Sequence, residues 1–284
     1  MTKRREVQRR VTAFGEIRGI LAAMKNLALL ELQKIGRFAT DQRRAVQSIE
    51  QAAGDFLSFY LKQLPGPGNF SPVYLLIGSE RGFCGDFNEQ LIAQSATWLA
   101  QAQPPENLIV VGSRLAMALE RSRKEGIRVQ GAEVAEDVES VLAVAVERLG
   151  QIQRDRRDAR PIALTALYHD DESGAVRVRR LLPMPDLPAP REAFVYPPYL
   201  DLPPMQLLRK LTDHYLYAAL HEVLYSSLLA ENRQRLTHMD GAMRRIDEDL
   251  GKLKLKYNAL RQEEIIEDIE VILLSADLLR RDGD

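Results

Sequence analysis

The sequence predicts an α/β protein in which long N- and C-terminal helices form an antiparallel coiled coil, with a small Rossmann-like α/β domain between them. Three observations support this fold. The last quarter of the chain lacks proline and carries a heptad pattern, residues 3–64 also lack proline, and short apolar strands alternate with helices in the middle. The predicted boundaries are residues 1–64 for the first helix, 70–200 for the α/β domain and its proline-rich connector, and 205–284 for the last helix.

Apolar residues in the last helix recur at steps that alternate between three and four. They are Leu236, Met239, Met243, Ile246, Leu250, Leu253, Tyr257 and Leu260. This spacing is typical of a helix that lies along another helix. The phase slips by one residue after Leu260 and resumes at Ile265, so the coil is expected to end or loosen there. One helix over this stretch would be on the order of 110 Å long, and we expect much of it to meet another chain.

The first helix carries a matching pattern. Its apolar residues at helical spacing are Val7, Val11, Phe14, Ile17, Leu21 and Met24. Gly15, Gly19, Gly36 and Gly54 weaken it, since each costs up to about 1 kcal/mol relative to alanine. Packing against the last helix is therefore expected to hold the first one. The break between helix and domain is predicted at residues 65–69, which read Pro-Gly-Pro-Gly-Asn.

The middle of the chain has the alternation of an α/β sheet. Strands are predicted at 73–77, 108–111, 127–129, 162–167 and 176–182. Helices are predicted from the first loop to about residue 102, from 113 through 124, and over 138–149. This order indicates a small, mostly parallel sheet with helices on its faces. A segment rich in proline then leads back to the last helix as an extended connector.

The composition excludes several classes of protein. Of 284 residues, 45% are hydrophobic and 28% charged, with a net charge of −1, so a folded core is expected and nucleic acid is not. Cys84 is the only cysteine, which excludes an internal disulfide and a multi-cysteine metal site. The sequence has no uncharged apolar run of about 18 residues that could span a membrane.

The glycine loop at 78–85 follows the first strand, where nucleotide-binding proteins hold phosphate. A phosphate loop needs Lys and then Ser or Thr after its last glycine, but Gly85 is followed by Asp86 and Phe87. Glu80 would also repel a pyrophosphate. We therefore predict no bound cofactor and assign the loop to a tight turn that starts a helix close to the sheet.

Other reactive side chains do not form a catalytic set. His214 and His221 lie seven residues apart on one helix and are predicted to be partly exposed packing residues, not metal ligands. Cys84 has no neighbouring base in the sequence and is predicted to fill space in the core. The chain is accordingly predicted to be no enzyme and to bind no metal.

Three segments resemble the gamma subunit of the F-type ATP synthase. Residues 20–25 (ILAAMK) are similar to the family's ITKAM(K/E) signature, and residues 78–88 (GSERGFCGDFN) are similar to its SDRGLCGGLN. The third segment runs from Glu231 through Arg235 and Met239 to 257–262 (YNALRQ), like the family's ending. The three occur in the family's order and spacing over nearly the whole chain.

The departures from the family pattern are typical of a divergent branch, such as the alternative F-type ATPase that accompanies an ordinary one in some bacteria. The family's VAASK reads LALLE at 27–31, its ATDNA reads AMRRI at 242–246, and its threonine is Ile266. The tail at 280–284 is charged where the family usually stops soon after a small apolar segment.

The resemblance implies a non-catalytic rotor, the central stalk of a complex that couples hydrogen-ion or other ion transport to ATP synthesis or hydrolysis. Its partners would be the alpha and beta subunits of the catalytic head, the epsilon subunit and the membrane c-ring. It would be a peripheral protein on the cytoplasmic face of the bacterial inner membrane. The residues that this resemblance and the helix pattern assign to contacts between rotor and stator are Met24, Lys25, Arg235, Arg261, Gln262, Ile269, Ile272 and Leu273.

Two other classes of function compete with this interpretation. A coiled-coil scaffold or adaptor with an unrelated α/β domain would self-associate through its helices. A nucleotide-dependent α/β enzyme would bind its ligand as an isolated chain. A rotor would instead occur once per catalytic hexamer.

Overall fold

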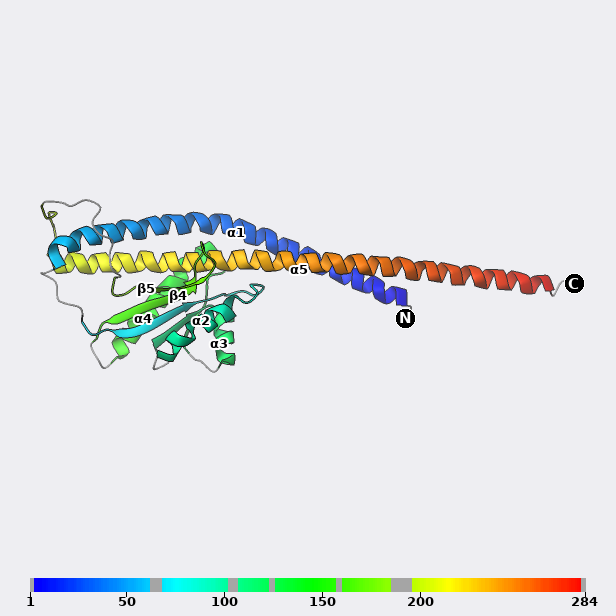
Figure 1. The fold of residues 1–284 in the computed structure, drawn as a ribbon, viewed down its shortest axis with the longest axis horizontal. Coiled ribbons are helices and arrows are strands. Elements are labelled where there is room, and N and C mark those ends of the chain that lie inside the picture. The colour runs from blue at the N-terminus through cyan, green and yellow to red at the C-terminus, as the bar shows by residue number, and fades with distance from the viewer. Residues whose placement is uncertain are drawn as a thin grey trace. The chain divides into compact units, whose positions relative to one another are not determined.

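The computed structural model describes residues 3–61, 68–101, 107–122, 126–156, 160–184 and 196–281. The chain divides into two compact units. We call residues 1–27 with 237–284 the coil unit, and residues 28–236 the sheet unit. Two long helices, α1 (Lys3–Tyr60) and α5 (Pro204–Arg281), contribute to both units (Figure 1). Most of the predicted break at 65–69 and half of the proline-rich connector lie outside the described residues.

The coil unit confirms the heptad seam of α5. Met239 and Leu250 are buried, and the other seam residues up to Leu260 are half-buried. Across the seam, α1 contributes Val7 and Leu21 as buried residues. Alternating steps of three and four keep one face of each helix against the other, which is why these positions lose their contact with water.

One part of the predicted α1 pattern is wrong. Ile17 was expected on the seam but is 47% exposed. A strict heptad that runs through Val7, Val11 and Phe14 passes next through Arg18 and Lys25, and both side chains pair with carboxylates of α5. Long cationic side chains can occupy such positions because their aliphatic stems pack while their charged ends reach water.

The phase slip after Leu260 leaves the helix intact, since α5 continues to Arg281. The next seam position is Glu264, which is half-buried, whereas Ile265 and Ile269 are exposed. One residue corresponds to about 100° around a helix with 3.6 residues per turn. The apolar stripe beyond Leu260 is therefore directed away from the seam, as the sequence predicted.

The sheet unit contains five strands whose positions match the predicted ones. They are β1 (Ser71–Ile77), β2 (Leu108–Val111), β3 (Ile127–Val129), β4 (Ile162–His169) and β5 (Val176–Arg180). Their order in the sheet is β3-β2-β1-β4-β5, and every neighbouring pair is parallel except β4 and β5. Three helices connect them: α2 (Phe87–Gln101), α3 (Ser113–Arg121) and α4 (Val138–Asp155). This is the doubly wound arrangement of Rossmann-like domains with one antiparallel edge strand.

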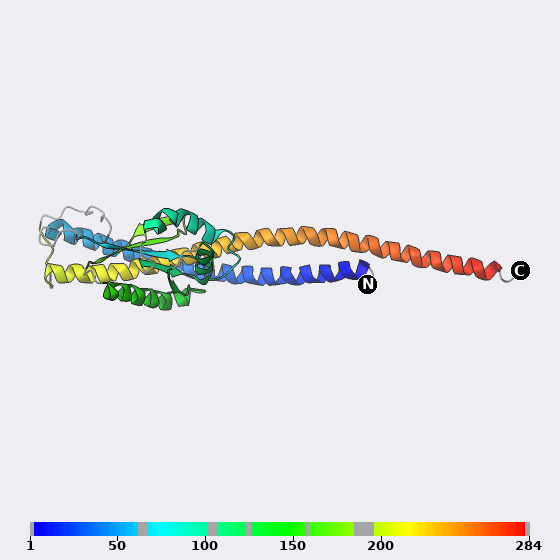
Figure 2. The same ribbon diagram turned by 90° about the horizontal axis from the view of Figure 1, so that it is seen from below.

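Helices cover both faces of the sheet (Figures 1 and 2). Successive side chains of β1 alternate between the faces, so Leu76 packs with α2 and α3 while Leu75 packs with α4. The face that carries α4 also carries the sheet-unit parts of α1 and α5, whose Ile35 and Tyr215 are fully buried in the same cluster. The larger core therefore joins the two long helices to the sheet.

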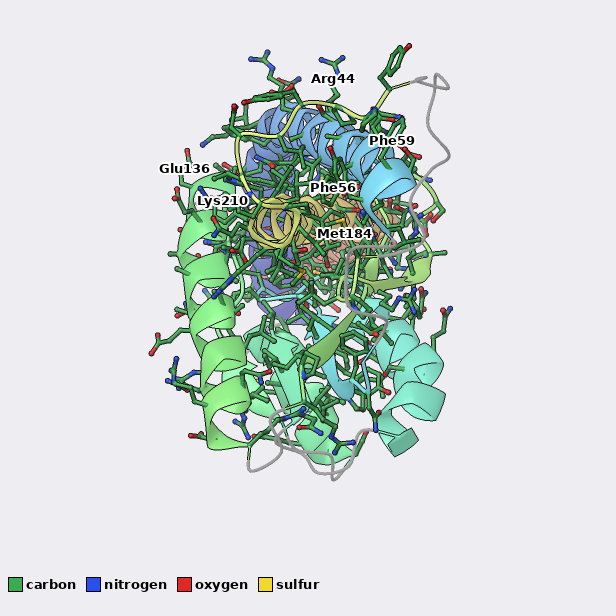
Figure 3. The ribbon with its side chains drawn as sticks, turned by 90° about the vertical axis from the view of Figure 1, so that its left-hand side faces the viewer. Arg44, Phe56, Phe59, Glu136, Met184 and Lys210 are labelled. Atoms are coloured by element: carbon green, nitrogen blue, oxygen red, sulfur yellow. The ribbon has the colours of Figure 1, made fainter. Side chains whose placement is uncertain are left out.

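Figure 3 shows the sheet unit from the end where α1 finishes and α5 begins. Phe56 of α1 points inward and is buried, whereas Arg44 of the same helix points away from the protein. Among the described residues, no helix is long and apolar enough to cross a membrane.

Candidate subunit-contact site

The polar pair Arg261 and Gln262 lies on the exposed surface of α5 in the coil unit. Both follow Leu260, the last apolar residue of the seam, and both side chains are available to another protein. A guanidinium has five donors and an amide both donates and accepts, so this pair can bind a carboxylate-bearing loop. The contact itself stays a prediction.

An exposed apolar stripe follows this pair along α5. Ile269 is 51% exposed, and the exposed fractions of Ile272 and Leu273 are 64% and 63%. Large aliphatic side chains exposed together on one helix are unusual on a protein that has no partner. The stripe can make close contacts without directional hydrogen bonds, which suits a surface that slides or turns against another.

On α1, the predicted contact residues differ in their surroundings. Lys25 donates to Asp240, with 2.6 Å between Nζ and Oδ1, and both side chains are partly buried. Met24 is half-buried beside the seam. Ile17, Ile20 and Leu27 surround it at helical spacing and are exposed, so Met24 belongs to a second apolar stripe on the outer side of α1.

Arg235 lies in the interior of the sheet unit, where it is 6% exposed. Its guanidinium pairs with Glu231, donates to the carbonyl of Gly82 at 3.3 Å and contacts the sulfur of Cys84 at 3.4 Å. These contacts fasten the glycine loop to α5. The side chain is thus held by its own chain, and a contact of Arg235 with another subunit stays a prediction.

The carboxyl of Glu231 is completely buried beside this guanidinium. Burial raises the pKa of Glu231 from 4.5 to about 7, although Arg235 and backbone N–H groups of the loop oppose the shift. Burial likewise raises the pKa of the Cys84 thiol to about 12. Cys84 is buried as predicted and remains a neutral thiol at physiological pH, which makes it a poor nucleophile.

The glycine loop brings Glu80 to the carboxyl end of the parallel strands. Its carboxylate accepts hydrogen bonds from Ser113 N at 2.8 Å, Ser113 Oγ at 2.7 Å and Gly131 N at 2.7 Å. Ser113 is the first residue of α3, where free N–H groups attract anions. The anion-attracting N-terminus of α3 is therefore occupied by a side chain of this protein.

Close approach of the backbone explains a glycine at this edge. Gly112 has a φ of 109°, and an added Cβ would lie 2.7 Å from the carbonyl oxygen of Gly78. A side chain at Gly112 would push the loop away from the end of β2. Within the loop, an added Cβ at Gly78 would lie 2.6 Å from Asn88 Oδ1 of α2, so this helix starts close to the end of β1.

An ionic network joins both long helices to the antiparallel edge of the sheet unit. Arg179 of β5 donates to Glu222 of α5 at 2.7 Å and to Glu50 of α1 at 3.3 Å. Arg43 of α1 reaches Asp171, in the turn after β4, at 2.7 Å and Glu222 at 3.8 Å. Neighbouring carboxylates raise the pKa of both arginines, while burial raises the pKa of Glu50. The network thus holds α1, α5 and the sheet edge together.

The remaining candidates behave as packing residues. His221 is more buried than predicted and lies against the rings of Tyr217 and Tyr225, whereas His214 is exposed. In the part of the chain that the structure describes, no group of three or more His, Cys, Asp or Glu residues could hold a metal ion.

The sequence interpretation missed the charged residues that fasten the elements together. A strict heptad on α1 would have found Arg18. Glu80 was predicted only to repel phosphate. It follows the last residue of β1, Ile77, by three residues, so its position near the end of the strand could have been inferred from the sequence. The partners of Arg179 and Arg43 are more than forty residues away in the chain, and no local pattern indicates them.

These two units define a coiled-coil protein with a Rossmann-like domain inserted between its long helices. The family model described as ATP synthase matches residues 3–279. The chain therefore belongs to the ATP synthase family.

Relatives and solved structures agree with this assignment. The chain is 26% identical to the ATP synthase gamma chain of Clostridium beijerinckii, over 94% of this chain and 95% of the relative. It is also 26% identical to the gamma chain of Moorella thermoacetica, over 99% and 100%. Its fold is similar to a chain of the Euglena gracilis mitochondrial ATP synthase, with a TM-score of 0.60 at 14% identity over 99% of this chain and 96% of that one. A central-stalk and c-ring structure from Tetrahymena thermophila gives a TM-score of 0.55 at 16% identity, over 78% and 99%.

Proposed function

We propose that this chain is the gamma subunit of a rotary ATP synthase, the non-catalytic shaft that couples ion-driven rotation to the catalytic head. The observation that carries the proposal is the exposed end of α5, where Arg261 and Gln262 precede the apolar stripe of Ile269, Ile272 and Leu273. The family and the gamma-chain relatives support it. In this function the coil unit contacts the alpha and beta subunits, and the sheet unit contacts the epsilon subunit and the membrane c-ring.

The arrangement of the chain fits a mechanical element. A rotor must bias the affinities of several catalytic sites in turn, which requires a rigid element with different surfaces on different sides. The coil unit has a polar pair and an apolar stripe on α5 and a second apolar stripe on α1. The location we propose for the assembled complex is the cytoplasmic face of a bacterial inner membrane, with this subunit peripheral to it.

Subunit counting tests the proposal. The tagged chain, purified from membranes of a bacterium that expresses it, is expected to bring down three alpha and three beta subunits per copy of itself. The pure chain alone is expected neither to bind ATP at micromolar concentration nor to release phosphate from it. Self-association without catalytic subunits would favour the scaffold, and ATP turnover by the pure chain would favour an enzyme.

The polar pair provides a second test. We expect Arg261→Ala with Gln262→Ala to leave the subunit assembled but to reduce ATP synthesis and hydrolysis several-fold, since charge-assisted hydrogen bonds contribute roughly 1.5–3 kcal/mol each. Rates are measured on the purified complex. Arg244→Ala, an exposed arginine on the same helix, controls for the loss of charge. Wild-type rates for the double variant at equal assembly would refute the contact.

A further inference from the structure

Among the described residues of the coil unit, ion pairs connect the two helices at several points. Lys25 pairs with Asp240 at 2.6 Å, Arg18 with Asp247 at 2.5 Å, and Arg4 with Glu264 at 2.9 Å. The first two keep one register. From Lys25 to Arg18 the chain moves seven residues back along α1, and from Asp240 to Asp247 it moves seven residues forward along α5. That is one heptad on each antiparallel helix.

The same register predicts which residues should face each other one and two heptads further along the coil. It would place Val11 beside Lys254, and Arg4 beside Arg261. Two guanidinium groups at one position of a coil repel each other, and like charges across a coil are a known means of excluding one pairing in favour of another. The structure pairs Arg4 with Glu264 instead, three residues, or nearly one helical turn, beyond Arg261.

Glu264 is suited to receive Arg4. It occupies the seam position that follows Leu260, where the apolar stripe has already turned away, and its side chain is 33% exposed. Arg4 therefore has a partner that lies three residues beyond Arg261 along α5. Arg261 itself is exposed.

We propose that Arg4 is a positioning residue: with Glu264 as its partner, it keeps the side chain of Arg261 out of the coil and available to the stator. The inference rests on the proposed function, because it assigns a cause to the outward direction of a predicted contact residue. The ion pair of Arg18 with Asp247 is assigned a different role: it fixes the register of the two helices, and none of the predicted stator contacts is assigned to it.

Exchanging the charges separates positioning from simple support of the coil. The variant Arg4→Glu with Glu264→Arg keeps an ion pair between the two positions, so a merely structural pair would be fully rescued. Under the proposal, the new carboxylate at position 4 also attracts Arg261 into the coil. The assembled complex is then expected to lose ATP hydrolysis several-fold, and Arg261→Ala is expected to cause a similar loss.

The matched control is the exchange Arg18→Asp with Asp247→Arg, which reverses another ion pair between the same two helices. It is expected to retain wild-type hydrolysis at equal assembly. Wild-type activity of the exchange at positions 4 and 264, in a complex that Arg261→Ala does impair, would overturn the proposal.

A melting experiment on the full-length isolated chain tests the same inference without the complex. In the wild-type background, Arg261→Ala is expected to leave the melting temperature unchanged or raise it slightly, because a repulsion is removed. In the exchanged background, the same substitution is expected to lower it by about 1–3 °C, because an attraction is removed. Equal effects in the two backgrounds overturn the proposal. If the effect of Arg261→Ala on the melting temperature reverses its sign between the two backgrounds, the positioning of Arg261 by Arg4 is upheld. If Arg261→Ala also leaves the complex fully active, the contact of Arg261 with the stator is refuted.

Discussion

Replacing Arg179 with methionine is expected to destabilise the sheet unit by about 3 kcal/mol. Removing one partner of a buried ion pair leaves an uncompensated charge, which typically costs about 3–5 kcal/mol, and the partly exposed setting favours the lower value. Glu50 would lose the guanidinium it pairs with, and Glu222 would keep only its longer contact with Arg43. Urea unfolding of the full chain, followed by circular dichroism, measures the change.

Arg177 supplies the control, since it lies on the same strand. Its side chain is 61% exposed, against 17% for Arg179, and it pairs with Asp170 at 3.5 Å. Surface pairs contribute about 0–1 kcal/mol, so Arg177→Met is expected to change the free energy of unfolding little. Similar losses for the two variants would show that the network around Arg179 does not carry the expected share of stability.

The second large effect is expected from Arg235→Met, and it should depend on pH. The unfolded chain releases the Glu231 proton near pH 4.5, whereas burial holds the folded pKa near 7. Between these values the folded state binds more protons, so the stability it contributes falls as pH rises. Without Arg235 the folded pKa rises further. The loss relative to wild type should therefore widen above pH 7 by up to about 1.4 kcal/mol per pH unit.

Unfolding measured at pH 6 and pH 9 tests this dependence. Glu231→Gln removes the titrating group while keeping the shape of the side chain, so in that background the effect of Arg235→Met should be the same at both pH values. A loss that does not grow with pH in the wild-type background would mean that Glu231 is not the group whose proton Arg235 controls.

Much of the fold could be predicted because its signals are periodic. The seam from Met239 to Leu260 repeats over several heptads, so a single exception could not hide it. The strands β1, β2 and β4 were found because they are short apolar runs, and β5 because valine alternates with arginine along it. Ile17 was misplaced because only apolar residues were followed along α1, whereas the strict heptad position is Arg18, which pairs with Asp247.

The candidate site was only partly predictable. The heptad phase, which local sequence contains, places Arg261 next to the last seam residue, Leu260. The pairing of Arg4 with Glu264, and the network around Arg179, join residues far apart in the chain, and only the folded arrangement brings them together. The same holds for Arg235. The family motif singles this residue out, but the sequence does not show that its side chain is buried against Gly82 and Cys84.

The carboxylate of Glu80 has a wider consequence for a part that must turn under load. A phosphate taken from solution would come and go with the concentration of metabolites, and the loop it holds would tighten and loosen with the energy state of the cell. Glu80 is covalently tethered beside Ser113 and Gly131, so its effective concentration there never changes. The glycine loop and the start of α3 are thereby held together by the chain itself, whatever the concentration of phosphate in solution.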